Sequence, residues 1–297
     1  MNTQPSQHHL KVPGGSVYYE VRGSGPLLLL VGQPMTSGPF GPLADLLAED
    51  HTVVTYDPHG LGESTIEDPA LAITPEIEAD DLAHIVDAVG GGPADMFGSS
   101  GGAVAGLALA ACHPENVSTV IAHEPPVAEL LPDAPYIRAA VDDIEDAYHA
   151  YGAGAAWGKF VSLVMHDGPV TEAGVAPAAW PPAGSDGDEA SAPSESAAGD
   201  APPEPSEKEQ ADNEVFFLRM LKPFTRYEPP VEALRAADPR IVIAVGAASR
   251  NEIAARSARE LAQQLEAPAV VFPDDHGGFM ADPTGFAARI RELTETH

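Results

Sequence analysis

The chain has 297 residues, 44% of them apolar, and its 45 acidic and 15 basic side chains give a formal net charge of −30. That apolar fraction is enough for a large buried core, so the composition excludes a chain that is disordered throughout. The charge argues against a nucleic-acid binder and against docking on anionic lipid, because phosphate groups would be repelled. The length fits one large α/β domain with an inserted subdomain.

Cysteine usage and the apolar runs bear on the cellular compartment. Cys112 is the only cysteine, which excludes an intrachain disulfide and a cysteine-rich zinc site. Met1–His9 lacks the apolar core of a signal peptide, and the longest apolar runs, 27–31 and 103–112, are too short to span a bilayer. No HExxH or G-K-[ST] motif occurs. We therefore expect a cytoplasmic protein that uses no metal or cofactor and acts on a small molecule, with its oligomeric state left open.

In chain order, short apolar runs alternate with helical patterns up to residue 126. Continuous apolar runs suit strands buried on both faces of a sheet. Thr74 and Pro75 suit the start of an amphipathic helix that Gly90 ends. The expected strands are Ser16–Val21, Leu27–Val31, Thr52–Tyr56, Ala94–Phe97 and Val117–Ala122, and the expected helices are Pro42–Glu49, Pro75–Val89 and a small-residue helix that ends at Cys112.

The alternation breaks after Pro126 and returns after Pro230. Residues 167–214 contain eight prolines and twelve acidic side chains, a composition that predicts a disordered acidic loop rich in Pro, Ala and Ser. Helices are expected on either side of it, at 134–165 and 215–221, and the chain closes with strands at 241–245 and 269–272 and helices at 252–265 and 283–293.

This order of elements predicts an α/β fold with a mostly parallel central sheet and helices on both faces. Residues 1–126 and 231–297 would form the core, and residues 127–230 a helical cap or lid. Since ligands of open α/β sheets bind at the carboxyl edge, the lid is expected to lie there.

The most specific motif is Gly98-Ser99-Ser100-Gly101-Gly102, a G-x-S-x-G pattern between a strand and a helix. So sharp a turn holds Ser100 in a strained conformation and requires small neighbours for clearance. The N-terminus of the next helix supplies free N–H groups and a positive dipole end beside the serine. The alternative interpretation is a Gly-Ser loop that merely turns the chain.

Three further segments, in the same order along the chain, resemble the α/β-hydrolase family. Val31-Gly32-Gln33-Pro34 is similar to the family's His-Gly-x-Pro loop, Asp57–Ser64 to its D-x-R-G-x-G-x-S turn, and His276 follows the last strand within Pro273–Phe279. The family's loop histidine is Val31 here and its turn arginine is His59.

The resemblance implies the α/β-hydrolase fold and the roles of four residues. Ser100 would be the nucleophile, His276 the general base, and the backbone N–H groups of Gln33 and Gly101 the oxyanion hole. Asp57 is expected to brace its own turn by accepting backbone hydrogen bonds rather than to act in catalysis.

The third member of the triad is not at its usual place. The family usually carries its acid after the strand 241–245, where this chain has Ser249. Some members carry it after the preceding strand instead, and Glu124 stands there, so Glu124 is our candidate. Glu252 is the alternative, and a dyad without an acid is the remaining one; Glu124 could also be a rim carboxylate at the base of the lid.

The predicted cap holds ten of the chain's 18 aromatic residues. This enrichment favours an apolar pocket, although cap helices also need aromatic residues simply to pack on the sheet. The expected pocket residues are Met35, Tyr151, Trp157, Phe160, Phe217 and Phe279.

Together these features predict an esterase-like serine hydrolase that acts on a small, apolar, uncharged ester or related acyl compound. One alternative is a cofactor-free lyase or cyclase of secondary metabolism that uses His276 as its base. Another is a non-catalytic ligand-binding protein on the same fold, which the missing acid at its usual place favours.

Overall fold

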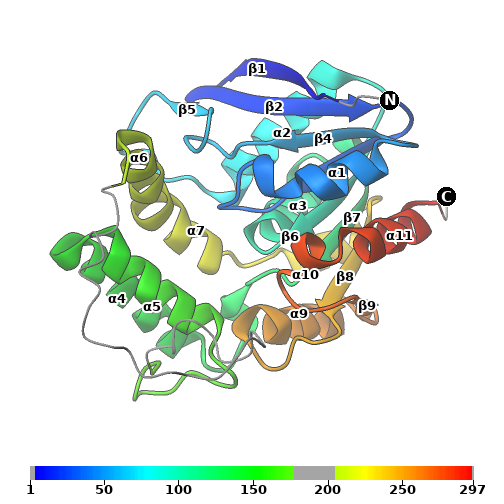
Figure 1. The fold of residues 1–297 in the computed structure, drawn as a ribbon. Helices are drawn as coiled ribbons and strands as arrows, with labels where there is room; N and C mark the ends of the chain where they lie inside the picture. The colour runs from blue at the N-terminus through cyan, green and yellow to red at the C-terminus, as the bar shows by residue number, and fades with distance from the viewer. Residues whose placement is uncertain (1–3, 177–204, 296–297) are drawn as a thin grey trace, which may run out of the picture.

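The structure is a computed structural model, and it describes residues 4–176 and 205–295. These residues form one nine-stranded sheet in the order β1-β2-β4-β3-β6-β7-β8-β9, with the short β5 paired to β2. Figure 1 shows this sheet running through the molecule. The strands are β1 (Ser6–Val12), β2 (Gly15–Gly23), β3 (Leu27–Val31), β4 (Thr52–Tyr56), β5 (Thr65–Ile66), β6 (Ala94–Ser99), β7 (Val117–His123), β8 (Arg240–Gly246) and β9 (Val270–Phe272).

The strands from β4 through β3, β6, β7 and β8 to β9 are parallel to one another, whereas β1, β2 and β5 pair antiparallel at one edge. The five leucine and valine residues of β3 are all buried, as expected for a strand covered on both faces. The mostly parallel sheet predicted from the alternation of strands and helices is therefore confirmed.

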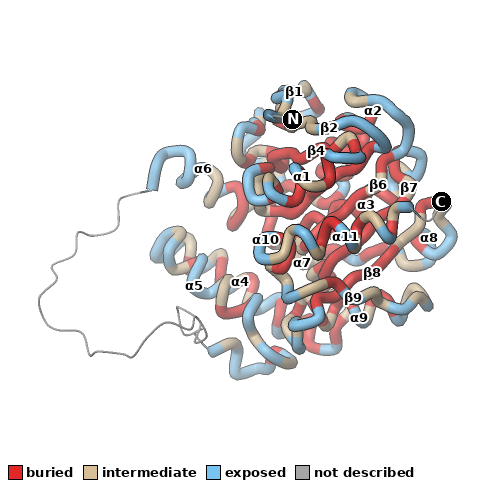
Figure 2. The backbone as a smooth tube through the Cα atoms, turned by 45° about the vertical axis from the view of Figure 1, so that its right-hand side comes forward, coloured by how far each residue is buried: buried red, intermediate tan, exposed pale blue. Residues whose placement is uncertain are grey.

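Helices cover both faces of the sheet, and alternate residues of each strand contact opposite layers. Leu28 and Leu30 pack with α1 and α11, whereas Leu29 and Val31 pack with α2, α3 and α9. Figure 2 shows the buried residues concentrated along the central strands and α3. The core helices are α1 (Gly41–Leu47), α2 (Pro75–Val89), α3 (Gly101–Cys112), α8 (Val231–Ala236), α9 (Ile253–Gln264), α10 (Gly278–Ala281) and α11 (Pro283–Thr294).

The cap segment follows β7 in the chain. It contains α4 (Ala134–Tyr151), α5 (Ala153–Val164), α6 (Glu207–Val215), a π-helical turn (Phe216–Met220) and α7 (Leu221–Thr225). Figure 1 shows these helices grouped on one side of the sheet, at the end where β6 and β7 lead into α3 and the cap. Among the described residues, no helix is both long and apolar enough to cross a membrane.

One strand was not predicted, and one expectation was wrong. No strand was expected before Ser16, yet β1 pairs with β2 along its whole length; its mostly exposed residues carry no apolar alternation because it is an edge strand. The predicted disordered loop at 167–214 is wrong at both ends. Val170 is buried and its N–H donates to Asp133 at 2.7 Å, and Ser206 and Glu209 form a capping box that starts α6. Residues 177–204 of that loop lie outside the described residues.

The backbone packs closely behind Ser100, and substitution of a glycine there tests this packing. A methyl group on Gly102 would lie 2.2 Å from the Val31 carbonyl oxygen, whereas one on Gly158, inside α5, would meet nothing within 4 Å. We expect Gly102→Ala to lower the free energy of unfolding by roughly 2–3 kcal/mol, and Gly158→Ala to raise it by about 0.5–1 kcal/mol through helix propensity. Denaturant unfolding measures both, and equal changes in the two variants would contradict this packing.

Candidate active site

The predicted triad residues lie at the carboxyl edge of the parallel strands. Ser100 follows β6, Glu124 follows β7, and His276 follows β9. All three line one cavity between this edge and the cap. Residues far apart in the sequence thus meet because neighbouring parallel strands end at the same edge.

Ser100 lies at a strained turn, as the G-x-S-x-G pattern predicts. Its φ of 56° and ψ of −124° are unfavourable for any residue with a side chain. The small neighbours are required: a Cβ on Gly98 would lie 2.5 Å from the Gly102 carbonyl oxygen. The Ser100 N–H donates to the His123 carbonyl at 3.0 Å, which ties the turn to β7. The serine is thereby held at the N-terminus of α3.

Glu124 contacts His276 directly. His276 Nδ1 donates to Glu124 Oε2 at 2.7 Å, and the Gly246 N–H donates to Glu124 Oε1 at 2.9 Å. Glu124 has a φ of 47° and is 1% exposed. Its position is therefore fixed by β8 on one side and by the imidazole on the other.

Electrostatics keep this buried carboxyl ionised. Burial by itself would raise the pKa of Glu124, but the hydrogen bond and the charge of His276 overcome that effect and hold the pKa at about 2. Beneath the pair lies His123, whose ring stacks on His276 at a centroid distance of 6.1 Å. Burial lowers the pKa of His123 to about 4, so the stacked ring is neutral at pH 7.

Ser249 and Glu252, the other two positions considered for the acid of the triad, have different contacts from Glu124. Ser249, where the family's acid usually stands, lines the same cavity near Glu124. Glu252 also reaches the cavity, but its carboxylate accepts from the Arg250 N–H at 2.7 Å and faces the Arg250 side chain. Among the contacts of the described residues, His276 bonds to Glu124 and not to Glu252.

The two predicted oxyanion-hole residues are adjacent. A Cβ on Gly101 would lie 2.8 Å from the Gln33 carbonyl oxygen and 2.9 Å from its Cβ. Gly101 is the first residue of α3, so its N–H has no intrahelical acceptor. Asp57 braces its turn as predicted by accepting the Glu63 N–H at 2.8 Å, and it also accepts the Ser37 N–H at 2.8 Å from the loop that carries Gln33.

The cavity has a volume of about 270 Å³ and a mainly apolar cap wall. That wall includes Ile137, Phe160, Leu163, Val164, Met165, Phe216, Met220, Leu221 and Phe224. The charged or ionisable side chains at the cavity are Glu124, Glu252, Asp275 and His276, and no lysine or arginine of the described chain lines it.

Of the six predicted pocket residues, only Phe160 lines the cavity. Tyr151 is 82% exposed at the end of α4, and Trp157 donates a hydrogen bond to Asn213 at the surface. Phe217 packs inside the cap against Tyr148 and Trp157. Met35 and Phe279 belong to the core layer beside α1. The aromatic count could not tell which face of each cap helix a residue occupies.

Two features of the site were not predicted from the sequence. One is the π-helical turn at Phe216–Met220, where the Arg219 carbonyl accepts the Ile73 N–H at 2.9 Å and joins cap to core. This carbonyl has no helical donor because the residue four positions on is Pro223, which lacks an N–H. Glu78 and Asp81 are buried under the loop that carries Gln33. Their spacing of three on the apolar face of α2 was the available signal. Among the described residues, no group of three or more His, Cys, Asp or Glu side chains is arranged to hold a metal ion.

Comparison with known proteins agrees with this fold. Residues 25–186 match the family model described as alpha/beta hydrolase fold. The uncharacterized hydrolase YraK of Bacillus subtilis (strain 168) is 30% identical over 296 residues, which cover 96% of this chain and 95% of that protein. The chain therefore belongs to the alpha/beta hydrolase family.

Solved structures resemble the chain over nearly its whole length. A thermophilic esterase from Thermogutta terrifontis superposes with a TM-score of 0.68 and 19% identity, covering 98% of both chains. The carboxylesterase CesB (YbfK) from Bacillus subtilis gives a TM-score of 0.62 and 15% identity, covering 99% of this chain and 92% of the other. At these identities the likeness shows the fold alone.

The low pKa of Glu124 leads to a test of stability against pH. In the unfolded chain this carboxyl titrates near 4.5, and in the folded chain at about 2. Its ionised form therefore contributes stability, on the order of 3 kcal/mol, that is fully present above pH 4.5 and lost as the pH falls toward 2. We expect the difference in unfolding free energy between the wild type and Glu124→Gln to shrink between pH 6 and pH 3. A difference that does not change over this range would contradict the assigned interaction.

Proposed function

We propose that this chain is a serine hydrolase that cleaves a small, uncharged, apolar ester or related acyl compound. The observation that carries the proposal is the hydrogen bond between the buried Glu124 and His276, beside a strained Ser100 at the same cavity. A strained serine at a helix N-terminus together with a His–carboxylate pair is the arrangement required for nucleophilic acyl transfer.

In the first half of the reaction, Ser100 Oγ attacks the acyl carbon while His276 Nε2 takes the hydroxyl proton. Glu124 keeps the other proton of the ring on Nδ1 and stabilises the imidazolium. The negative charge on the substrate oxygen is held by the backbone N–H groups of Gln33 and Gly101. The bond to the alcohol then breaks, and His276 gives its proton to the leaving oxygen.

In the second half, water attacks the acyl group on Ser100. His276 takes a proton from this water and returns one to Ser100 Oγ, so the enzyme is restored and a carboxylic acid is released. The release of an anionic product is helped by the surroundings, because Glu252 and Asp275 face the cavity and the chain carries a net charge of −30.

The cavity lining supports an uncharged and compact substrate. Its cap wall is apolar, its volume is about 270 Å³, and no described Lys or Arg reaches it to bind a carboxylate or phosphate. A substrate with an ionised acyl chain would lose hydration without gaining a partner and would be repelled by the acidic side chains.

The nucleophile and the acid are tested together with a chromogenic short-chain ester. We expect Ser100→Ala and Glu124→Gln to lower kcat by about 10⁴-fold or more, because one removes the attacking oxygen and the other the group that fixes the ring of His276. The matched control is Glu252→Gln, which removes a carboxylate at the same cavity and should change kcat by less than about threefold.

A fluorophosphonate probe followed by intact-mass analysis identifies the reactive side chain independently. Labelling should occur at Ser100 and be absent in Ser100→Ala. Full turnover in Ser100→Ala, or a loss of turnover in Glu252→Gln in place of Glu124→Gln, would contradict the assignment. A wild-type chain that resists labelling would instead support a ligand-binding protein.

The substrate class is tested with two esters of equal acyl length, p-nitrophenyl butyrate and p-nitrophenyl hemisuccinate. We expect kcat/KM to be about tenfold or more higher for the butyrate, because the hemisuccinate carboxylate finds no cationic partner in the cavity. Equal values would show that an anionic acyl chain is accommodated and would overturn the uncharged-substrate assignment.

A further inference from the structure

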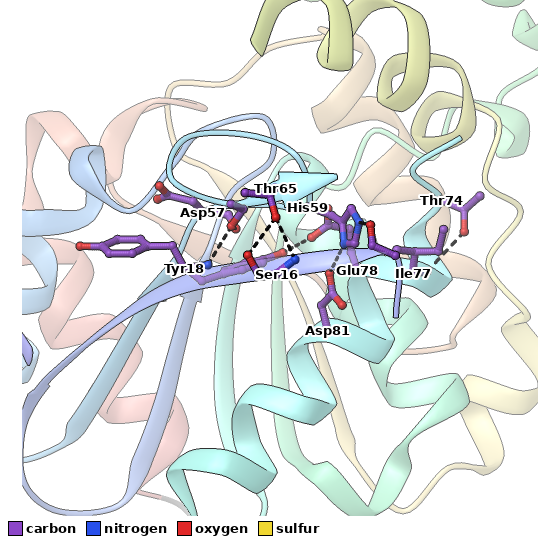
Figure 3. Close-up of polar contacts among 12 residues, drawn as sticks. Ser16, Tyr18, Asp57, His59, Thr65, Thr74, Ile77, Glu78 and Asp81 are labelled. Carbon is purple, nitrogen blue, oxygen red and sulfur yellow. Dashed lines mark hydrogen bonds and ion pairs between the residues drawn. The ribbon is translucent and has the colours of Figure 1, made fainter. Parts of the chain in front are cut away.

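A cluster of buried ionisable side chains lies directly beneath the loop that carries Gln33, and the proposed reaction does not use it. Its members are Tyr56 at the end of β4, His59 in the following turn, and Glu78 and Asp81 on α2. All four are nearly inaccessible to water. Figure 3 shows Glu78 and Asp81 projecting from α2 toward His59.

The Glu78 carboxylate joins three separate segments of the chain. Its Oε2 atom accepts hydrogen bonds from Gln33 Nε2 at 3.0 Å and from the Tyr56 hydroxyl. Its Oε1 atom accepts the backbone N–H of His59 at 3.0 Å. Gln33 Nε2 also donates to Tyr56 Oη, so loop, strand and helix are held at one point.

Charge balance in the cluster depends on His59. Its Nδ1 faces Asp81 Oδ2 at 2.8 Å and its Nε2 faces the Gly14 carbonyl oxygen at 3.3 Å, so both ring nitrogens have acceptors. Burial opposes protonation, but Asp81 and Glu78 outweigh it and raise the pKa of His59. This imidazole thus lies beside two carboxyl groups, and burial together with the charge of Asp81 raises the pKa of Glu78 to about 7.

Protonation of Glu78 would disturb its hydrogen bonds to Gln33 and Tyr56 for a geometric reason. The ionised carboxylate receives three donors, two of them on Oε2. A proton placed on Oε2 would point at Tyr56 Oη and Gln33 Nε2, which already donate there, so one of these hydrogen bonds would break. Gln33 also touches Gly101, so a shift of the loop would alter the spacing of the two N–H groups that the proposed function assigns to the oxyanion.

We propose, resting on the proposed function, that Glu78 is a positioning residue of the oxyanion hole: its carboxylate holds the Gln33 side chain and so directs the Gln33 backbone N–H at the developing negative charge. Because that charge forms only in the transition state, loss of the Glu78–Gln33 hydrogen bond should lower kcat and leave KM nearly unchanged.

The test is a double-mutant cycle on the full chain with p-nitrophenyl butyrate. Glu78→Gln removes the negative charge, and Gln33→Leu removes the side chain that Glu78 holds while keeping the backbone N–H. We expect each to lower kcat by about ten- to a hundredfold with KM changed less than about threefold. The double variant should be no slower than the slower single variant, since both act through one contact. Glu76→Gln, an exposed position on α2, is the matched control and should keep wild-type kcat.

The pH dependence separates positioning from a merely structural role. Since Glu78 titrates at about 7, facing His59, Asp81 and Tyr56, the wild type should resemble Glu78→Gln at low pH. The ratio of wild-type to Glu78→Gln kcat should therefore rise between pH 6 and pH 8. Tyr56→Phe, which removes one donor, should show a smaller loss of kcat and serves as the readout if Glu78→Gln does not fold.

Three results would overturn the inference. The first is a kcat ratio that does not depend on pH, and the second is a double variant in which the two losses of kcat multiply. The third is full kcat in Glu78→Gln or, if that variant does not fold, in Tyr56→Phe. Labelling of Ser100 in the wild type shows whether such a result refutes this inference alone or the proposed function as well. If Ser100 is labelled and the ester is cleaved, such a result refutes the role of Glu78 alone. If Ser100 is not labelled, the proposed function fails and this inference fails with it.

Discussion

The hydrogen bond between Glu124 and His276 is the interaction on which the candidate site depends. It joins residues 152 positions apart and spans the ends of β7 and β9. Both partners need it: a carboxylate with 1% exposure requires a cationic or donating neighbour, and the imidazole requires a fixed tautomer to act as a base. The sheet supplies the geometry, because β8 lies between the two strands and donates the Gly246 N–H to the second carboxylate oxygen.

The fold followed from the sequence because the buried elements carry strong local signals. Leu27–Val31, Thr52–Tyr56 and Pro75–Val89 have the predicted bounds, since continuous apolar runs and a Thr-Pro start leave few alternatives. The edge strand β1 was missed because an exposed edge needs no apolar pattern. The start of α6 was missed because a local capping box outweighs an acidic, proline-rich composition.

The site was predictable where a backbone turn encodes it and unpredictable where packing decides. The small residues around Ser100 and the position of Glu124 after β7 are visible in the sequence and follow from topology. The cavity wall is not, because Phe160 and Tyr151 belong to the same aromatic enrichment and differ only in the helix face they occupy. Glu78 was overlooked for a related reason: an acidic residue on a helix is ordinarily solvated, and only the tertiary structure shows it beneath Gln33.

Two groups of charged side chains, at different depths, thus support the proposed reaction. The outer group is the His276–Glu124 pair at the cavity, and the inner group is the buried cluster around Glu78 beneath the Gln33 loop. Each keeps a buried carboxylate satisfied by several donors, since an unpaired buried charge would be strongly destabilising. The cap wall of the cavity is mainly apolar, and within the described part of the chain it offers no cationic partner for an anionic substrate.

In the proposed mechanism, Glu124 determines which ring nitrogen of His276 carries the proton. Nitrogen-15 NMR of histidine-labelled protein at about pH 9, with His276 assigned from the His276→Gln spectrum, measures this directly. We expect the neutral ring to carry its proton on Nδ1 in the wild type and to change to the Nε2 tautomer in Glu124→Gln. A wild-type ring protonated on Nε2, or a tautomer that the substitution leaves unchanged, would contradict it.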